Sequence, residues 1–213
     1  MRTKAEAAAI VEALKNEYPV GICSLDYDNA WQLMVAVRLS AQCTDARVNI
    51  VTEILFEKYP TLAKLAAASA EEIETIVRPC GLGPSKARDI HAAANIVLNE
   101  HGGRLPNTME GLLKLPGVGR KSANLILGDI YRVPGVVIAD THCIRMANRL
   151  GFVKSKDPMK VETALRKALP PEESNDYCHR CVLHGRAVCT ARKALCDSCC
   201  LSALCPRLGT NTT

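Results

Sequence analysis

One glycine-rich stretch organises this chain: Leu115-Pro116-Gly117-Val118-Gly119-Arg120-Lys121-Ser122-Ala123. Glycines allow positive φ angles and leave backbone N–H groups uncovered by side chains. A glycine hairpin that leads into a helix N-terminus can bind an anion, because free N–H groups and the positive end of the helix dipole point outward together. A DNA phosphate fits such a site without any base being read. The stretch therefore predicts a hairpin before a helix, with phosphate contacts at Gly117, Val118 and Gly119.

Lys121 comes directly after the hairpin, in the first turn of the predicted helix. The helix dipole disfavours an ammonium at this end and so favours the neutral amine that a nucleophilic lysine needs. The alternative is a tight turn followed by a solvated lysine, since turn signals of this kind are common.

Length and composition set the bounds on the fold. The 213 residues suffice for one large domain or two small ones, and 48% are hydrophobic while only 4% are aromatic. Alanine and leucine are frequent, which favours helices. No apolar run reaches the roughly 18 residues that cross a bilayer, and residues 1–17 lack the apolar core of an export signal. We therefore expect an intracellular protein.

The basic charge is concentrated in the second half of the chain. Residues 1–100 have a net formal charge of −3 and residues 101–213 of +8, which together give +5. A basic surface favours a polyanionic partner. An ordinary solvated surface is the alternative.

Apolar spacing and capping signals predict an all-α chain. Capping boxes begin two helices, at Thr3 with Glu6 and at Ser69 with Glu72. Helices also follow a cap at Asp28 or Asn29 and a cap at Thr44. Further helices are predicted from Ser85 to Gly102-Gly103, and over 141–150, 158–169 and 175–188. The apolar run 135–139 is a strand or a buried connection, and we favour the connection because no partner strand is visible.

Cysteines crowd the C-terminal part, where seven of the eleven lie between Cys178 and Cys205. In an intracellular chain this favours metal or cluster ligation over disulfides. The run Cys189-x6-Cys196-x2-Cys199-x5-Cys205 has only one C-x2-C pair, whereas zinc ribbons use two, so it favours an iron–sulfur cluster held by four thiolates. Zinc and a set of inert buried cysteines remain alternatives. Cys200 is an extra thiol beside Cys199 and is an alternative ligand in its place.

Two further features leave alternatives open. Cys178 and Cys181 form a second C-x2-C pair, which belongs to a helix or shares a zinc site with the run. Asp140 ends the run 135–139 and precedes a helix, which is typical of an N-cap. The functional alternative pairs Asp140 with Lys121, where a carboxylate accepts the amine proton or stabilises a cationic sugar as a glycosidic bond breaks.

Taken together, these segments resemble the endonuclease III family of the helix-hairpin-helix DNA glycosylase superfamily. The resemblance spans nearly the whole chain and rests on six segments: 115–123, Asp140-Thr141-His142 with Arg145, His184-Gly185-Arg186, the four-cysteine run, Ser40–Asp45, and Gly81-Leu82. It implies an all-α fold of two helical lobes: a helical domain with the helix-hairpin-helix at 24–134, and a 4Fe-4S cluster domain formed by 1–23 and 135–213. DNA would bind in the cleft between them.

The resemblance also implies residue roles. Lys121 would be the nucleophile on the anomeric carbon of the sugar, Asp140 would activate it, and the resulting Schiff base would allow strand cleavage by β-elimination. Gln42 would fill the gap left by a flipped nucleotide, Leu82 would wedge into the base stack, and His142 would assist near the DNA backbone. Without the resemblance, Gln42 and His142 are helix-start residues and Leu82 is an apolar loop residue.

The expected function is a bifunctional DNA glycosylase and AP lyase acting on oxidised pyrimidines. Its partner would be double-stranded DNA with a damaged base or an abasic site, and the protein would be a cytoplasmic, nucleoid-associated monomer. Cys43, Cys181 and Cys200 depart from the residues expected in relatives. Two other functions compete: a non-catalytic DNA-binding module, and a monofunctional mismatch glycosylase, which the presence of Lys121 argues against.

Overall fold

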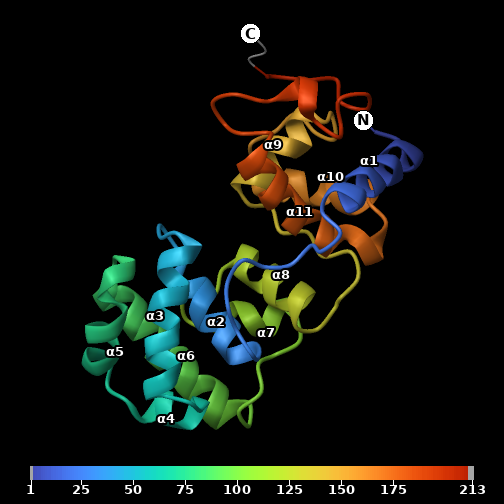
Figure 1. Ribbon diagram of the computed structural model, residues 1–213. Helices are drawn as coiled ribbons and strands as arrows, with labels where there is room; N and C mark the ends of the chain where they lie inside the picture. The colour runs from blue at the N-terminus through green and yellow to red at the C-terminus, as the bar shows by residue number, and fades with distance from the viewer. Residues whose placement is uncertain (1, 211–213) are drawn as a thin grey trace. The chain divides into compact units, whose positions relative to one another are not determined.

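Helices account for the regular structure of this protein, whose computed structural model describes residues 2–210 (Figure 1). Within that range there is no strand, and one isolated antiparallel bridge joins Cys189 to Ala194. The chain divides into two units, one of Cys23–Tyr131 and one of Met1–Ile22 with Arg132–Thr213. None of the helices described is both long enough and apolar enough to cross a membrane. The all-α prediction is confirmed.

The unit of residues 23–131 is built around two helices. Its elements in chain order are α2 (Ala30–Leu39), α3 (Asp45–Lys58), α4 (Leu62–Ala67), α5 (Ala70–Val77), the 3₁₀ turn η1 (Arg78–Cys80), α6 (Gly83–Glu100), α7 (Met109–Leu113) and α8 (Arg120–Asp129). Residues 32–37 and Leu39 of α2 are all buried, as expected of a helix that is apolar on every side. It packs against α3, α6 and α8, while α6 packs against α4 and α5. The end of α2 and the start of α6 are thereby fixed, and Gln42 and Leu82 lie beside these two ends.

The other unit combines the two ends of the chain. Its elements are α1 (Lys4–Glu17), α9 (Thr141–Arg149), α10 (Pro158–Ala168), the 3₁₀ turn η2 (Pro171–Glu173), α11 (Ser174–Ala187) and the 3₁₀ turn η3 (Cys196–Ser198). Helix α11 packs against α1 and α9 (Figure 1). Arg2 donates hydrogen bonds to the carbonyls of Leu150 and Leu204, which ties the N-terminus to the end of α9 and to the C-terminal segment.

Most predicted helix starts are confirmed. Thr3, Asn29, Thr44 and Ser69 each accept a backbone hydrogen bond in the first turn of their helices. The connection at 135–139 is also confirmed, because it forms no strand and Gly135 N–H donates to Pro171 O (2.7 Å).

Two helix predictions were wrong. Helix α6 begins at Gly83, two residues before the predicted Ser85, because Pro84 fits the first turn of a helix, where no N–H is needed. Helix α4 was missed. Its signal is Thr61, which caps Lys64 N, followed by the buried Leu62, Leu65 and Ala66.

Candidate functional site

The glycine stretch forms the turn between α7 and α8. Gly117 has φ +76°, and a Cβ atom there would lie 2.6 Å from Cδ of Arg38. Arg38 forms an ion pair with Asp89 of α6 at 2.7 Å. Glycine is therefore required at 117 both by its backbone angle and by the close approach of this ion pair.

Gly119 is the N-cap of α8, and no side chain caps this helix. It is exposed, and no atom lies within 4 Å of where its Cβ would be. Val118, between the two glycines, is buried and anchors the turn through its N–H bond to Leu115 O (3.1 Å). The backbone at the start of α8 is thus accessible to a ligand, as the predicted phosphate contact requires.

Lys121 is exposed in the first turn of α8. Within residues 2–210, no hydrogen bond or ion pair engages its side chain. Its ammonium is close enough to Cys23 to lower the pKa of that thiol. Burial and the carboxylates of Asp129 and Asp45 nevertheless raise the pKa of Cys23 to about 12, so Cys23 is a neutral thiol. The Lys121 side chain is therefore accessible to a ligand.

Gln42 and Leu82 adopt the same unusual backbone conformation. Their φ angles are +57° and +53°, in the left-handed region that side chains with a Cβ rarely adopt. Both residues are exposed, Leu82 to 53%. Gln42 lies between α2 and α3, and Leu82 precedes α6. Strained, exposed residues of this kind cluster at binding sites.

Asp140 is the N-cap of α9, as one of its two interpretations predicted. Its Oδ1 accepts a hydrogen bond from Cys143 N (2.7 Å), and its backbone N–H donates to Ile138 O (2.9 Å). No further hydrogen bond to its carboxylate is found among the described residues. The side chain is half-buried. One oxygen therefore holds the helix start and the other can take part in chemistry.

His142 is held between α9 and α11. Its Nδ1 accepts a hydrogen bond from Nη2 of Arg145 (3.0 Å), and Nη2 also donates to Gly185 O (2.9 Å). Burial lowers the pKa of His142, and the positive charges of Arg145 and Arg186 lower it further, while the carboxylate of Asp140 raises it. The net shift is downward, so the ring is neutral. A Cβ at Gly185 would lie 2.6 Å from Nδ1, which explains the glycine in the His184-Gly185-Arg186 segment.

The four cysteines of the run line one cavity. Cys189, Cys196, Cys199 and Cys205 line a small cavity of about 20 Å³ together with Arg149 and His184. Cys200 is not part of its lining. Backbone and side-chain N–H groups point at three of the sulfurs: Arg149 Nη1 donates to Cys189 Sγ (3.1 Å), Leu201 N to Cys199 Sγ (3.4 Å) and Arg207 N to Cys205 Sγ (3.3 Å).

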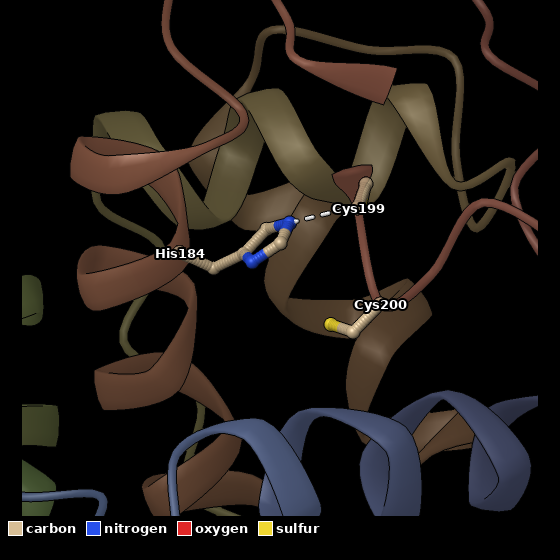
Figure 2. Close-up of side chains that lie close together, drawn as sticks. All are labelled: His184, Cys199 and Cys200. Atoms are coloured by element: carbon tan, nitrogen blue, oxygen red, sulfur yellow. Dashed lines mark hydrogen bonds between the residues drawn. The ribbon is translucent and has the colours of Figure 1, made fainter. Parts of the chain in front are cut away.

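His184 borders this cavity from α11. Figure 2 shows its ring reaching Cys199, with Nε2 and Sγ 3.3 Å apart. Its Nδ1 lies 3.2 Å from the Tyr18 hydroxyl, and burial lowers its pKa to about 4. His184, Cys199 and Cys200 each place one donor atom within 4.8 Å of the others. Burial, with Cys199 and Glu17 nearby, raises the pKa of Cys200 to about 11.

Comparison with known proteins identifies the family. Residues 35–171 match the model of the HhH-GPD superfamily base excision DNA repair proteins. The chain is 44% identical to the endonuclease III of Synechocystis sp. over 203 residues, which cover 95% of this chain and 93% of that protein. It is 37% identical to the Escherichia coli K12 endonuclease III over 202 residues, 95% of each. The chain belongs to the endonuclease III family.

A solved member of the endonuclease III family has the same fold. It is a trapped endonuclease III–DNA covalent intermediate, with a TM-score of 0.88 and 39% identity over 97% of each chain. The family resemblance drawn from the sequence is therefore confirmed.

The cysteine cavity fits the kind of group that a four-cysteine run implies. Four thiols converge on it, and three of them accept N–H···S hydrogen bonds, which are typical of thiolates bound to iron–sulfur clusters. Burial, and the mutual repulsion of neighbouring thiolates, raise the pKa of Cys199 and of Cys205. A bound metal would offset that repulsion. The cavity is thus compatible with an iron–sulfur cluster.

The second C-x2-C pair lies elsewhere in the same unit. Cys178 and Cys181 are buried on α11, and Cys178 Sγ lies 4.0 Å from Cys143 Sγ and accepts Ile138 N–H (3.2 Å). Neither lines the cysteine cavity. They pack as core thiols behind Asp140.

Sequence reasoning missed two residues that hold these sites, Lys86 and Arg149, and named Gly185 without finding its structural reason. Lys86 is buried beneath Gln42 and Leu82, Arg149 binds the Cys189 loop through three carbonyls and one sulfur, and Gly185 makes room for His142. Lysine and arginine are almost never fully buried without partners, but nothing in their sequence neighbourhood distinguishes these two from surface residues.

Proposed function

We propose that Lys121 and Asp140 carry out the reaction of this chain, which as an endonuclease III family member is a base excision repair DNA glycosylase and AP lyase acting on oxidised pyrimidines. The observation that carries the assignment is an exposed, unpaired lysine directly after the hairpin, in the first turn of α8. The pairing of Lys121 with Asp140 remains a prediction, since the two residues belong to different units.

The chemistry needs one amine and one carboxylate. The neutral Lys121 amine attacks C1′ of the deoxyribose and the N-glycosidic bond breaks. Asp140 accepts the proton that the amine loses and passes it to the departing base. The C1′–O4′ bond then breaks, O4′ takes the second amine proton, and C1′ forms a Schiff base with Lys121. Loss of a C2′ proton from that Schiff base breaks the C3′–O bond by β-elimination, which cleaves the strand on the 3′ side.

DNA binding is assigned to the loops described above. Gly117 and Gly119 offer backbone N–H groups to a phosphate, and Val118 holds the turn between them because its own N–H donates to Leu115 O. His142 contacts the DNA backbone. Gln42 occupies the gap left by the flipped nucleotide and Leu82 enters the base stack. Flipping costs a few kcal/mol and is cheapest at a damaged base, which contributes to selectivity. The partner is double-stranded DNA with a damaged base or an abasic site, bound by a monomer in the nucleoid.

We assign a 4Fe-4S cluster to Cys189, Cys196, Cys199 and Cys205. When bound, such a cluster crosslinks the C-terminal segment. The loop after Cys189 carries Arg192 and Lys193, both exposed, and its carbonyls are held by Arg149. An ordered loop presents these basic residues to phosphates, so the cluster contributes to DNA affinity rather than to base removal.

Borohydride trapping tests the nucleophile. Wild-type protein should form a covalent adduct with abasic duplex DNA in the presence of borohydride, because the Schiff base is reduced to a stable amine. Lys121→Gln should form none, although it should bind the same DNA. An adduct of undiminished yield with Lys121→Gln would remove Lys121 from this role.

A further inference from the structure

Lys86 is a fully buried lysine whose three N–H donors are all used. It lies on the first turns of α6 and is 0% exposed. Its Nζ donates to Leu39 O (2.8 Å), Ala41 O (2.8 Å) and Cys80 O (2.9 Å). An ammonium has three donors and no acceptor, so these three carbonyls satisfy it completely. No other side chain type offers three donors from one atom.

The three carbonyls belong to two separate loops. Leu39 ends α2 and Ala41 directly precedes Gln42, whereas Cys80 ends η1 two residues before Leu82. The carbonyls of Leu39 and Ala41 lie at the C-terminus of α2, where the helix dipole favours a cation. Lys86 therefore joins the Gln42 loop to the Leu82 loop from the buried side.

A second contact links the same loops. Cys43 follows Gln42, and Cys80 precedes Gly81 and Leu82. Burial, together with the charge and hydrogen bond of the Cys43 thiol, raises the pKa of Cys80 to about 11. The two loops thus meet through their thiols as well as through the ammonium.

Both loop tips hold a conformation that costs free energy. Gln42 and Leu82 have positive φ, and for a bulky residue such as leucine this is an outlier that persists only where surrounding contacts impose it. Yet both side chains are exposed and gain little packing there. The contacts that impose the conformation are therefore on the backbone. Cys43 N–H donates to Ser40 O (3.1 Å) across Gln42, and Lys86 N–H donates to Leu82 O (3.0 Å). The Lys86 ammonium adds bonds to the carbonyls of Ala41 and Cys80, which lie one residue before Gln42 and two before Leu82.

We propose that Lys86 is a positioning residue for the DNA-distorting step: its ammonium fixes the Gln42 and Leu82 loops relative to each other so that both side chains enter the duplex together. This inference rests on the proposed roles of Gln42 and Leu82. Fixing the loops in advance removes the cost of ordering them on DNA. The benefit should appear only when a base pair has to be opened, because an unpaired nucleotide needs little distortion.

The test compares two substrates. One duplex carries an oxidised pyrimidine paired with its complement, and the other carries the same lesion opposite a mismatched base. Lys86→Met keeps the length of the side chain and removes the donors. In single turnover it should be at least about 10-fold slower than wild type on the paired lesion and within about 2-fold on the mismatched lesion, because flipping costs least there.

The matched control is Val97→Ala on the same helix. Val97 is fully buried and lies toward the other end of α6, so its truncation lowers stability without touching either loop. It should change the rates on the two duplexes by the same factor. A 2-aminopurine opposite the lesion adds a spectroscopic readout: its fluorescence rise on binding, which reports unstacking, should be lost in Lys86→Met and kept in Val97→Ala.

A double-mutant cycle with Leu82→Ala sharpens the test. Because Lys86 acts through the loops, adding Lys86→Met to Leu82→Ala should slow the paired lesion by a smaller factor than in wild type. Equal losses on both duplexes, or a full additive loss in the double variant, would overturn the proposal. If Lys86→Met does not fold, Lys86→Gln replaces it under the same criteria, because its uncharged amide has two donors in place of three. Failure of the proposed function is distinct, since wild type would then release neither lesion.

Discussion

At the scale of single residues, Asp140 has a structural role that leaves its side chain free to take the catalytic role proposed for it. Its Oδ1 caps α9 through Cys143 N–H, as its position before a helix predicted. A carboxylate has two oxygens and about four acceptor sites. The cap therefore orients the side chain without consuming it. The Lys121 amine is also not engaged, because no hydrogen bond or ion pair within residues 2–210 involves its side chain.

Asp140→Asn separates these two roles. Asparagine is as good an N-cap as aspartate, so the variant should fold with a melting temperature close to wild type. Base release should fall by about 10²–10⁴-fold, the usual contribution of a general base. Single-turnover excision and thermal unfolding measure the two effects.

The control for this prediction is Asp157→Asn. Asp157 caps α10 through Met159 N–H (2.9 Å) and is exposed. It should lose neither stability nor activity. An Asp140→Asn variant that is as active as Asp157→Asn would show that Asp140 only caps the helix.

At the scale of elements, local sequence predicts where helices begin better than it predicts where loops point. Caps at Thr3, Asn29, Thr44 and Ser69 were predicted because one side-chain oxygen three residues ahead of an N–H decides them. The start of α6 was misplaced because Leu82 has no capping side chain and its conformation is held by distant residues. The hairpin is partly predictable from local sequence. Its glycines predict a turn, but the close approach of Arg38 to Gly117 cannot be predicted from the sequence.

Gly117→Ala tests the hairpin as an element. The added Cβ atom would lie 2.6 Å from Cδ of Arg38, and the alanine backbone would have to keep φ at +76°. The variant should therefore lose about 1–3 kcal/mol of stability and bind DNA more weakly. Denaturant unfolding and DNA titration measure both. Gly119→Ala provides the comparison. It has open space and φ −92°, so it should lose less than about 1 kcal/mol, because alanine is only a poorer N-cap than glycine there. Equal stability of the two variants would contradict this account.

At the scale of the whole molecule, the two units are built differently. Cys23–Tyr131 is continuous in sequence, whereas the other unit joins both ends of the chain. Arg2 links the N-terminus to the carbonyls of Leu150 and Leu204, and Arg149 links α9 to the Cys189 loop. The cysteine cavity thus depends on contacts between segments far apart in the chain.

Cysteine replacement tests which thiols hold the proposed cluster. Cys199→Ser should lose bound iron and visible absorbance, because Cys199 lines the cavity. It should also bind DNA more weakly and with a shallower salt dependence, since fewer basic residues reach phosphates. Cys200→Ser should keep its iron, as Cys200 does not line the cavity.

Iron retained by Cys199→Ser and lost by Cys200→Ser would reverse the ligand assignment. Full DNA affinity in an iron-free variant would remove the role given to the cluster.

The amino-acid sequence by itself determined the helical class, most helix starts, the family and the candidate residues. These follow from patterns that lie within a few residues of one another: caps, apolar periodicity, glycine turns and cysteine spacing. Only the tertiary structure decided that Lys86 joins the Gln42 and Leu82 loops, that Cys199 and not Cys200 lines the cavity, and that Gly185 makes room for His142. The physical reason is that a buried ammonium, a shared cavity and a close approach are each defined by groups that the chain brings together only when it packs.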